Sequence, residues 1–322
     1  MRAIVHSAAG GPEVLALRDR PAPEPGPAQI RVRVRAAGLN RADLLQRRGA
    51  YPAPPGWPAD MPGLEYAGEV AAIGDGVTRW HPGDRVMGLV GGGAHAEYVV
   101  VHQDEALRVP DSLSFTEAAA VPESFLTGWD ALVTRGRLQP GERVLLHAVG
   151  SGLGTAMIQL AKRLGATILG TSRTAAKLEQ ARAAGMDAGI DTSTESFREA
   201  VVPAVDVVID VLGGPAFADN LAVLTPRGRL VMLGFLQGPM VETSLEPLLR
   251  KRLEVIGSVM RTRGLEERIG LVREFTERVL PWFVAGSSLR PVIGATFAMT
   301  DVAAAHRAME ANEPFGKIVL TW

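Results

Sequence analysis

The residue run with the clearest chemical use is Arg-Val-Leu-Leu-His-Ala-Val-Gly-Ser-Gly-Leu-Gly, which spans Arg143 to Gly154. It leads from an apolar strand through a glycine-rich turn into a helix. The free N–H groups and positive dipole end of such a helix bind phosphate, and glycines let the backbone come close to it. The turn departs from the regular Gly-x-Gly-x-x-Gly pattern, so a purely structural turn is the alternative. We predict contacts with a bound dinucleotide from Gly150, Ser151, Gly152, Leu153 and Gly154.

The next strand end indicates which dinucleotide would bind. A site for NAD carries Asp or Glu there, roughly 20 residues after the glycine turn, to hold the ribose 2′-hydroxyl. This sequence instead has Ser172, Arg173 and, one helical turn later, Lys177, and it shows no carboxylate at that corner. The hydroxyl and the two cations suit a 2′-phosphate, so we predict NADPH as the cofactor. A solvated helix start is the alternative, because arginine supplies all but four of the 34 basic residues.

Apolar strands alternate with helices around these two motifs. We expect strands at residues 143–148, 167–171, 205–211, 229–235 and 253–260, and helices at 155–164, 175–184 and 216–224. Continuous apolar strands separated by helices are typical of a doubly wound parallel sheet, so residues 123–261 should form a Rossmann-type α/β domain. Ligands bind such a sheet at the carboxyl ends of its strands, where we expect Phe235 and Met260.

The residues before this domain are β-rich. Residues 29–36 alternate apolar and charged side chains, and shorter strands are expected at 69–73, 85–89 and 96–101. The proline-rich segment 51–58 must be an extended surface loop. The tail supplies a helix at 265–285, a strand near Val292, a helix at 303–309 and a strand at 317–322. Because residues 262–322 are too few for a third domain, we expect them to complete the domain formed by residues 1–122.

Composition excludes several classes of function. The 322 residues contain no cysteine, which rules out disulfides, iron–sulfur clusters, thiolate zinc sites and a cysteine nucleophile. The net charge of −1 gives no general attraction to nucleic acid or to an anionic membrane. No window approaches the roughly 18 apolar residues of a membrane span, and Met1–Val5 begins a strand-like stretch, with no signal-peptide core after it. We therefore expect a cytoplasmic protein that binds a small molecule.

Six ordered motifs give the chain a resemblance to a known family. They lie at residues 37–51, 62–68, 82–86, 118–127, 148–154 and 315–320. With them the sequence resembles the zinc-independent, zeta-crystallin-like quinone oxidoreductases of the medium-chain dehydrogenase/reductase superfamily, especially the tumour-suppressor-induced subgroup. The resemblance implies a GroES-like β-rich catalytic domain, a Rossmann domain and NADPH bound in the cleft between them. It also implies a homodimer, commonly built through the Rossmann sheets.

The resemblance also suggests which side chains act. It places the Asn40 amide near the nicotinamide ribose or the substrate oxygen, although a helix-capping role is the alternative. It makes the Tyr51 phenol the candidate contact to a bound quinone. It places Thr127 at the nicotinamide end, unless that residue only packs between domains. Lys317, in the last motif, completes the predicted cofactor contacts, whereas His147 is expected in the core.

A metal site is not expected. Zinc-dependent members of the superfamily use a cysteine and a His-Glu pair, but this chain has no cysteine and reads Leu64-Glu65 at the pair. Its six histidines show no ligand spacing. Asp43 and Arg48 are expected to pair along one helix or to line the site. Without a metal, the task of the protein is to place reduced nicotinamide against an easily reduced acceptor.

The leading hypothesis is therefore an NADPH-dependent quinone oxidoreductase. An NADPH-dependent reductase of activated alkenes, such as 2-alkenals or enones, is the alternative among enzymes, since the same site suits conjugate hydride delivery. A non-catalytic NADPH-binding protein, like a crystallin of similar sequence, is the alternative among binding proteins. A reductase module of a polyketide synthase is less favoured, because the sequence ends at Trp322.

Overall fold

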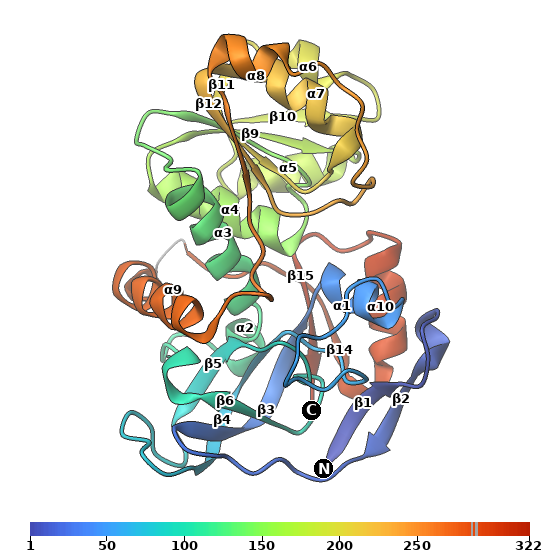
Figure 1. The fold of residues 1–322 in the computed structure, drawn as a ribbon, viewed down its shortest axis with the longest axis vertical. Coiled ribbons are helices and arrows are strands. Elements are labelled where there is room, and N and C mark those ends of the chain that lie inside the picture. Colours follow the sequence, from blue (N-terminus) through green and yellow to red (C-terminus); the bar gives the residue numbers. More distant parts are fainter. Residues whose placement is uncertain (285, 287–288) are drawn as a thin grey trace. The chain divides into compact units, whose positions relative to one another are not determined.

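The computed structural model describes residues 1–284, 286 and 289–322, which fold into two compact units. The β-rich unit contains Met1–Leu126 together with Met260–Trp322, and the Rossmann unit contains Thr127–Val259. Figure 1 labels most of their helices and strands. Among the described residues, no helix combines the length and the apolar character needed to cross a membrane.

A six-stranded parallel sheet forms the centre of the Rossmann unit. Its strands are β8 (Arg143–Leu146), β9 (Thr167–Ser172), β10 (Ala188–Asp191), β11 (Val205–Asp210), β12 (Leu224–Met232) and β13 (Glu254–Gly257). Their spatial order, β10-β9-β8-β11-β12-β13, is the order of dinucleotide-binding Rossmann folds. The helices are α3 (Thr127–Trp129), α4 (Gly152–Arg163), α5 (Ala175–Ala183), α6 (Phe197–Ala200), α7 (Gly214–Val223) and α8 (Glu246–Lys251). The predicted doubly wound parallel sheet is confirmed.

Three details of the Rossmann unit differ from the sequence expectation. The strand expected to end at residue 148 ends at Leu146, and Ala148 adopts a left-handed backbone with φ 55°, which a strand cannot contain. The sequence does not predict β10, because Ala188–Asp191 is short and has one β-branched residue. Phe235 lies beyond the end of β12, in a loop, with 55% of its surface exposed.

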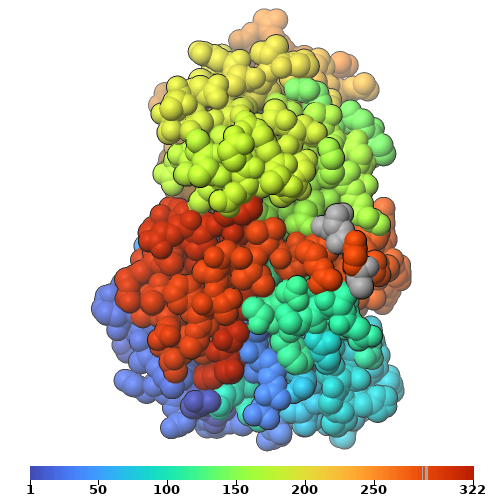
Figure 2. Space-filling model, turned by 180° about the vertical axis from the view of Figure 1, so that it is seen from behind, coloured from blue at the N-terminus to red at the C-terminus, as the bar shows by residue number. Residues whose placement is uncertain are grey.

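Residues from both ends of the chain build the sheet of the β-rich unit. Its strands are β3 (Gln29–Leu39), β4 (Glu65–Ile73), β5 (Arg85–Leu89), β6 (Tyr98–His102), β7 (Ala106–Arg108), β14 (Ile293–Ala298) and β15 (Lys317–Thr321), beside a separate pair, β1 (Arg2–His6) and β2 (Leu15–Asp19). Strand β15 pairs with β3. In Figure 2 the C-terminal residues (red) accordingly lie against N-terminal residues (blue) of this unit.

The helices of the β-rich unit are α1 (Arg41–Arg47), α2 (Phe115–Ala118), α9 (Leu265–Arg278) and α10 (Val302–Glu310). The helix expected at 265–285 ends at Arg278 and is followed by a 3₁₀ turn, Leu280–Trp282. Pro281 explains the early end, because proline has no N–H to continue the helical hydrogen bonds. Residue 285, the expected end, lies outside the described residues.

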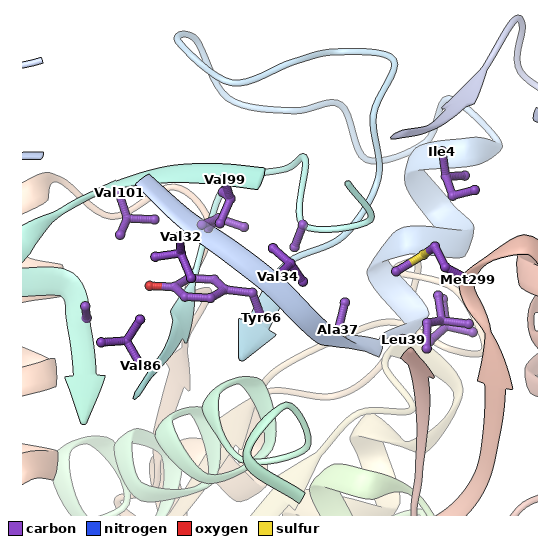
Figure 3. Packing of buried hydrophobic residues seen from close by; sticks show 14 of the residues in the cluster. Ile4, Val32, Val34, Ala37, Leu39, Tyr66, Val86, Val99, Val101 and Met299 are labelled. Atoms are coloured by element: carbon purple, nitrogen blue, oxygen red, sulfur yellow. The ribbon is translucent and has the colours of Figure 1, made fainter. Parts of the chain in front are cut away.

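Strand β3 links the core to the candidate site. Its first half buries alternate side chains, including Val32 and Val34, and Figure 3 shows the Tyr66 ring of β4 close to them. Its last four residues, Ala36–Leu39, are all buried, since β15 and β4 flank this end of the strand. The chain then enters α1 at its N-cap residue Asn40, directly after this buried end of β3.

Candidate active site

The glycine turn of the Rossmann unit is anchored to two neighbouring strand ends. The His147 N–H donates to the Ile209 carbonyl at 3.2 Å, and the Val149 N–H donates to the Thr171 carbonyl at 3.1 Å. Ser151 caps helix α4, because its Oγ accepts the Gly154 N–H at 3.0 Å. The turn therefore has a fixed path that ends at a helix N-terminus, as phosphate binding requires.

At two glycines in this turn, a side chain would meet neighbouring atoms at close range. A Cβ at Gly154 would lie 2.6 Å from the Ala148 carbonyl oxygen, which is backbone and cannot move away freely. A Cβ at Gly150 would lie 2.7 Å from the Lys177 Cδ, so the aliphatic stem of that lysine passes over the turn. The structure thus places Lys177 beside the predicted phosphate loop.

The end of β9, where the sequence predicts selection between NADPH and NADH, has a neighbouring carboxylate that the sequence analysis missed. Ser172 ends β9 and its Oγ accepts the Thr174 N–H at 3.2 Å, while Arg173 is exposed. Asp191 of the unpredicted strand β10 lies opposite Ser172 in the register. The expectation of a corner without any carboxylate is therefore wrong. The Asp191 carboxylate accepts two hydrogen bonds from Ser193, at 3.0 and 2.6 Å, which lower its pKa and keep it ionised.

A buried polar network lies beneath the glycine turn. The two ring nitrogens of His147 hydrogen-bond Thr171 Oγ1 at 2.9 Å and Asn220 Oδ1 at 2.8 Å. Burial lowers the pKa of His147, so the ring is neutral and bonds as one donor and one acceptor. This confirms His147 as a core residue, and its bonds join β9 and α7 to the chain just before the turn.

In the β-rich unit, Asn40 is held at both ends of its amide. Its Nδ2 donates to Glu65 Oε1 at 2.9 Å, and its Oδ1 accepts from the Lys317 ammonium, which also forms an ion pair with Glu65. Glu65 is fully buried, and Lys317 and Asn40 are 5% and 8% exposed. Glu65 lies in β4 and Lys317 in β15, the two strands on either side of the end of β3, and Asn40 follows that end directly, because Gly38 pairs with Glu65 and Leu39 pairs with Ile318.

The neighbouring carboxylate, Asp43, fixes the start of α1. It accepts the Asn40 N–H at 2.8 Å and the Gly63 N–H at 2.9 Å, and it is fully buried. Arg48 instead pairs with Glu310 of α10. The expected pairing of Asp43 with Arg48 along the helix is therefore wrong, because backbone donors already occupy the carboxylate.

Tyr51 lies in the same unit, on the predicted proline-rich loop. Its ring faces the guanidinium of Arg261, whose central carbon is 4.8 Å from the ring centroid. Burial, and then the charge of Glu123, raise the pKa of the Tyr51 phenol, whereas Arg261 lowers it. The raised pKa keeps the phenol protonated at neutral pH, so its hydroxyl can donate a hydrogen bond.

The remaining predicted site residues differ in their surroundings. Thr127 begins the Rossmann unit, and its Oγ1 is buried without a hydrogen-bond partner among the described residues. Met260 is half-buried and belongs to the β-rich unit. Where the chain is described, no group of three or more His, Cys, Asp or Glu side chains is arranged to hold a metal ion. An orphaned buried hydroxyl and a glycine turn without room for a Cβ both fit a bound dinucleotide.

Comparison with known proteins agrees with this arrangement. Residues 26–111 match the alcohol dehydrogenase GroES-like domain family, and residues 152–279 match the zinc-binding dehydrogenase family. A quinone oxidoreductase of Pseudomonas aeruginosa is 36% identical over 98% of this chain and 98% of its own. The chain belongs to the quinone oxidoreductase-like members of the medium-chain dehydrogenase/reductase superfamily.

Solved structures of this superfamily superimpose along the whole chain. A quinone oxidoreductase of Pseudomonas syringae has a TM-score of 0.90 at 32% identity, covering 100% of this chain and 99% of its own. The Escherichia coli quinone oxidoreductase complexed with NADPH has a TM-score of 0.86 at 29% identity, covering 100% of both chains. This medium-chain dehydrogenase/reductase is therefore an oxidoreductase with a GroES-like unit and a Rossmann unit.

The sequence analysis missed two side chains that hold predicted site residues in place. Glu65 is visible in the sequence only as half of an absent His-Glu pair, yet it holds both Asn40 and Lys317. Arg261 is one of many arginines, and the sequence does not show that it contacts Tyr51. Both act through contacts with residues distant in the chain, which no local pattern contains.

Proposed function

We propose that this protein is a zinc-independent NADPH:quinone oxidoreductase. The observation that carries the cofactor assignment is the position of Lys177 over Gly150, next to Arg173 at the end of β9. These cations suit a 2′-phosphate, which NAD lacks. The solved relative from Escherichia coli is complexed with NADPH, and relatives named quinone oxidoreductase support the acceptor class.

In this proposal, the residues of the site bind the cofactor and orient the acceptor. Gly150, Gly154 and the N-terminus of α4 would hold the pyrophosphate, and Thr127 would use its orphaned hydroxyl on the cofactor. When bound, the cofactor supplies the hydride. The Asn40 amide and the protonated Tyr51 phenol would donate to or orient the oxygen that gains negative charge. Zinc independence is supported by the donor set, which lacks cysteine and has Leu64 beside Glu65.

The cofactor assignment can be tested by fluorescence titration. Replacing Arg173 and Lys177 together with glutamine should weaken NADPH binding about tenfold or more and leave NADH binding nearly unchanged. Arg198→Gln, which removes an exposed arginine elsewhere in the Rossmann unit, is the control and should change neither. Equal losses for both nucleotides would contradict the 2′-phosphate assignment.

The acceptor class needs a panel of electrophiles. With NADPH saturating, an ortho-quinone should give a higher kcat/KM than a 2-alkenal, and Tyr51→Phe should lower the value for the quinone without weakening NADPH binding. A clear preference for the alkenal would replace this proposal with an alkene reductase. Tight NADPH binding without turnover of any electrophile would favour a non-catalytic binding protein.

We also propose a homodimer formed through the Rossmann unit. Strand β13 is an edge strand, and large exposed apolar side chains gather in the sequence around it: Phe235, Leu236, Met240, Val241, Leu245, Leu249, Val255 and Val259. Such exposure is typical of an interface. Leu249→Glu, at a residue 80% exposed, should convert the dimer to monomer in sedimentation velocity. Val202→Glu, 78% exposed outside that segment, is the matched control and should leave the dimer intact.

A further inference from the structure

Arg261 joins three separate segments of the β-rich unit. It is 9% exposed, and its Nε and Nη2 donate to the Gly91 carbonyl at 2.9 and 2.7 Å. Nη2 also donates to Gln46 Oε1 of helix α1 at 2.6 Å. Nη1 donates to the backbone carbonyl of Tyr51 at 2.9 Å. One guanidinium therefore fixes α1, the proline-rich loop and the chain after β5 relative to each other.

The same guanidinium lies against the Tyr51 ring, 4.8 Å from its centroid. Arg261 thus holds Tyr51 twice, by the backbone carbonyl and by the face of the ring. A cation at this distance from an aromatic centroid attracts the ring, more strongly when both are shielded from water. One side chain therefore contacts both the backbone and the ring of Tyr51.

The bonds of Arg261 all go to neutral acceptors. Guanidinium has five N–H groups, and four of them donate to the carbonyl and amide oxygens already named. Among the described residues, the second hydrogen of Nη1 meets no acceptor, and Asp43 and Glu123 act on Arg261 only through their charge. A buried cation without a carboxylate bonded to it keeps its field available to the ring beside it.

We propose that Arg261 is the positioning residue of the acceptor site, which holds the Tyr51 phenol in the orientation that meets the acceptor. The proposal rests on the proposed function, in which Tyr51 contacts the acceptor. Lysine could not replace the arginine, because an ammonium is a compact charge and lacks the planar fork that reaches three segments at once. Arg261→Lys therefore keeps the charge and removes the geometry.

The chain offers a direct readout of Tyr51, since it contains only three tyrosines. Protein labelled with 3-fluorotyrosine should give three ¹⁹F resonances, and Tyr51→Phe identifies the one from Tyr51. Without any acceptor present, Arg261→Lys should shift or broaden the Tyr51 resonance and leave the other two unchanged. Arg263→Lys, at a similarly buried arginine paired with Glu267, is the control and should not move it. An unmoved Tyr51 resonance in Arg261→Lys overturns the positioning role.

Steady-state kinetics test whether the position of Tyr51 affects turnover of the acceptor. Arg261→Lys should lower kcat/KM for the quinone by about 10- to 100-fold, the effect of misplacing a contact group by an ångström or so, with the NADPH dissociation constant unchanged. In a Tyr51→Leu background the same substitution should lose most of its effect. Full additivity in that background overturns the inference. A shifted resonance with unchanged turnover in both Arg261→Lys and Tyr51→Leu supports the positioning but refutes the proposed acceptor site.

If Arg261→Lys folds poorly, Gln46→Leu removes one of the four bonds and leaves the arginine in place. It should shift the Tyr51 resonance less than Arg261→Lys and reduce kcat/KM by a smaller factor. A Gln46→Leu protein whose Tyr51 resonance and kcat/KM both equal those of the wild type would overturn the proposal.

Discussion

Replacing Lys317 with methionine tests whether its ammonium is a structural partner or a cofactor ligand. The substitution leaves the Glu65 carboxylate buried and without its cation, and it removes the donor to Asn40 Oδ1. Breaking a buried ion pair on one side costs about 3–5 kcal/mol, because the other charge stays desolvated. With about 2–4 °C of Tm per kcal/mol for a unit of this size, the melting temperature should fall by about 6–20 °C.

Tryptophan fluorescence is a suitable assay because it reports mainly on the β-rich unit. Four of the five tryptophans, Trp57, Trp80, Trp282 and Trp322, lie there, and Trp129 alone lies in the Rossmann unit. Thermal and urea unfolding followed at this signal therefore measure the unit that contains the ion pair. Arg2→Met, which breaks an exposed pair with Glu97, is the control and should change stability by less than about 1 kcal/mol.

The double variant Lys317→Met with Glu65→Gln separates the two roles. Both charges are then absent, and the Asn40 amide can turn to accept from the new glutamine, so most of the lost stability should return. If Lys317 acts only through Glu65 and Asn40, NADPH affinity should return with stability. Restored stability without restored affinity would show that the ammonium itself binds the cofactor. A single variant that melts within a degree or two of the wild type would refute the electrostatic reasoning.

Two further outcomes follow from the geometry. Gly154→Ala places a methyl 2.6 Å from the Ala148 carbonyl oxygen, so NADPH affinity should fall about tenfold or more in a fluorescence titration. Gly270→Ala, at a residue with open space around the Cβ, is the control and should leave NADPH affinity unchanged. Burial, with His95 and Arg47, lowers the pKa of His306 to about 2. The unfolded imidazole titrates at about 6.5, so His306 should lower the free energy of unfolding by about 1.4 kcal/mol for each pH unit below that value. His306→Gln should flatten this slope in urea unfolding from pH 7 to pH 5.

The elements that could be predicted best from the sequence are those that depend on residues close together in the chain. The strand, glycine turn and helix from Arg143 onward depend on neighbours in the chain, and the parallel sheet follows from their repetition. Two predictions were wrong for physical reasons: strand β10 with Asp191 was not expected, and β8 was expected to continue to Ala148. Strand β10 is too short to show a period, and a left-handed backbone at an alanine has no sequence signal.

The hydrogen-bond partners of the predicted site residues could not be predicted from local sequence patterns. Asn40 bonds Glu65 and Lys317, which are 25 and 277 residues away, and Tyr51 bonds Arg261, 210 residues away. Only the pairing of β3 with β4 and β15 brings the first set together. The sequence could therefore identify Asn40 and Tyr51 as candidate site residues. Their orientation depends on contacts with residues that are distant in the chain and come together only when it folds.

These contacts give the C-terminal segment of the β-rich unit a role beyond completing a sheet. Lys317 holds the Asn40 side chain, Glu310 pairs with Arg47 on the following helix, and Arg261 holds Tyr51 at the end of the same stretch. Every one of these bonds joins residues 40–51 to residues beyond 260. The cations in these bonds, Arg47, Arg261 and Lys317, are all buried. A buried cation that loses its partners is costly, so these bonds should hold their segments more firmly than exposed ion pairs would. The candidate acceptor site is thus formed by the first part of the chain but oriented by the last, so substitutions in the tail should change substrate kinetics without touching substrate.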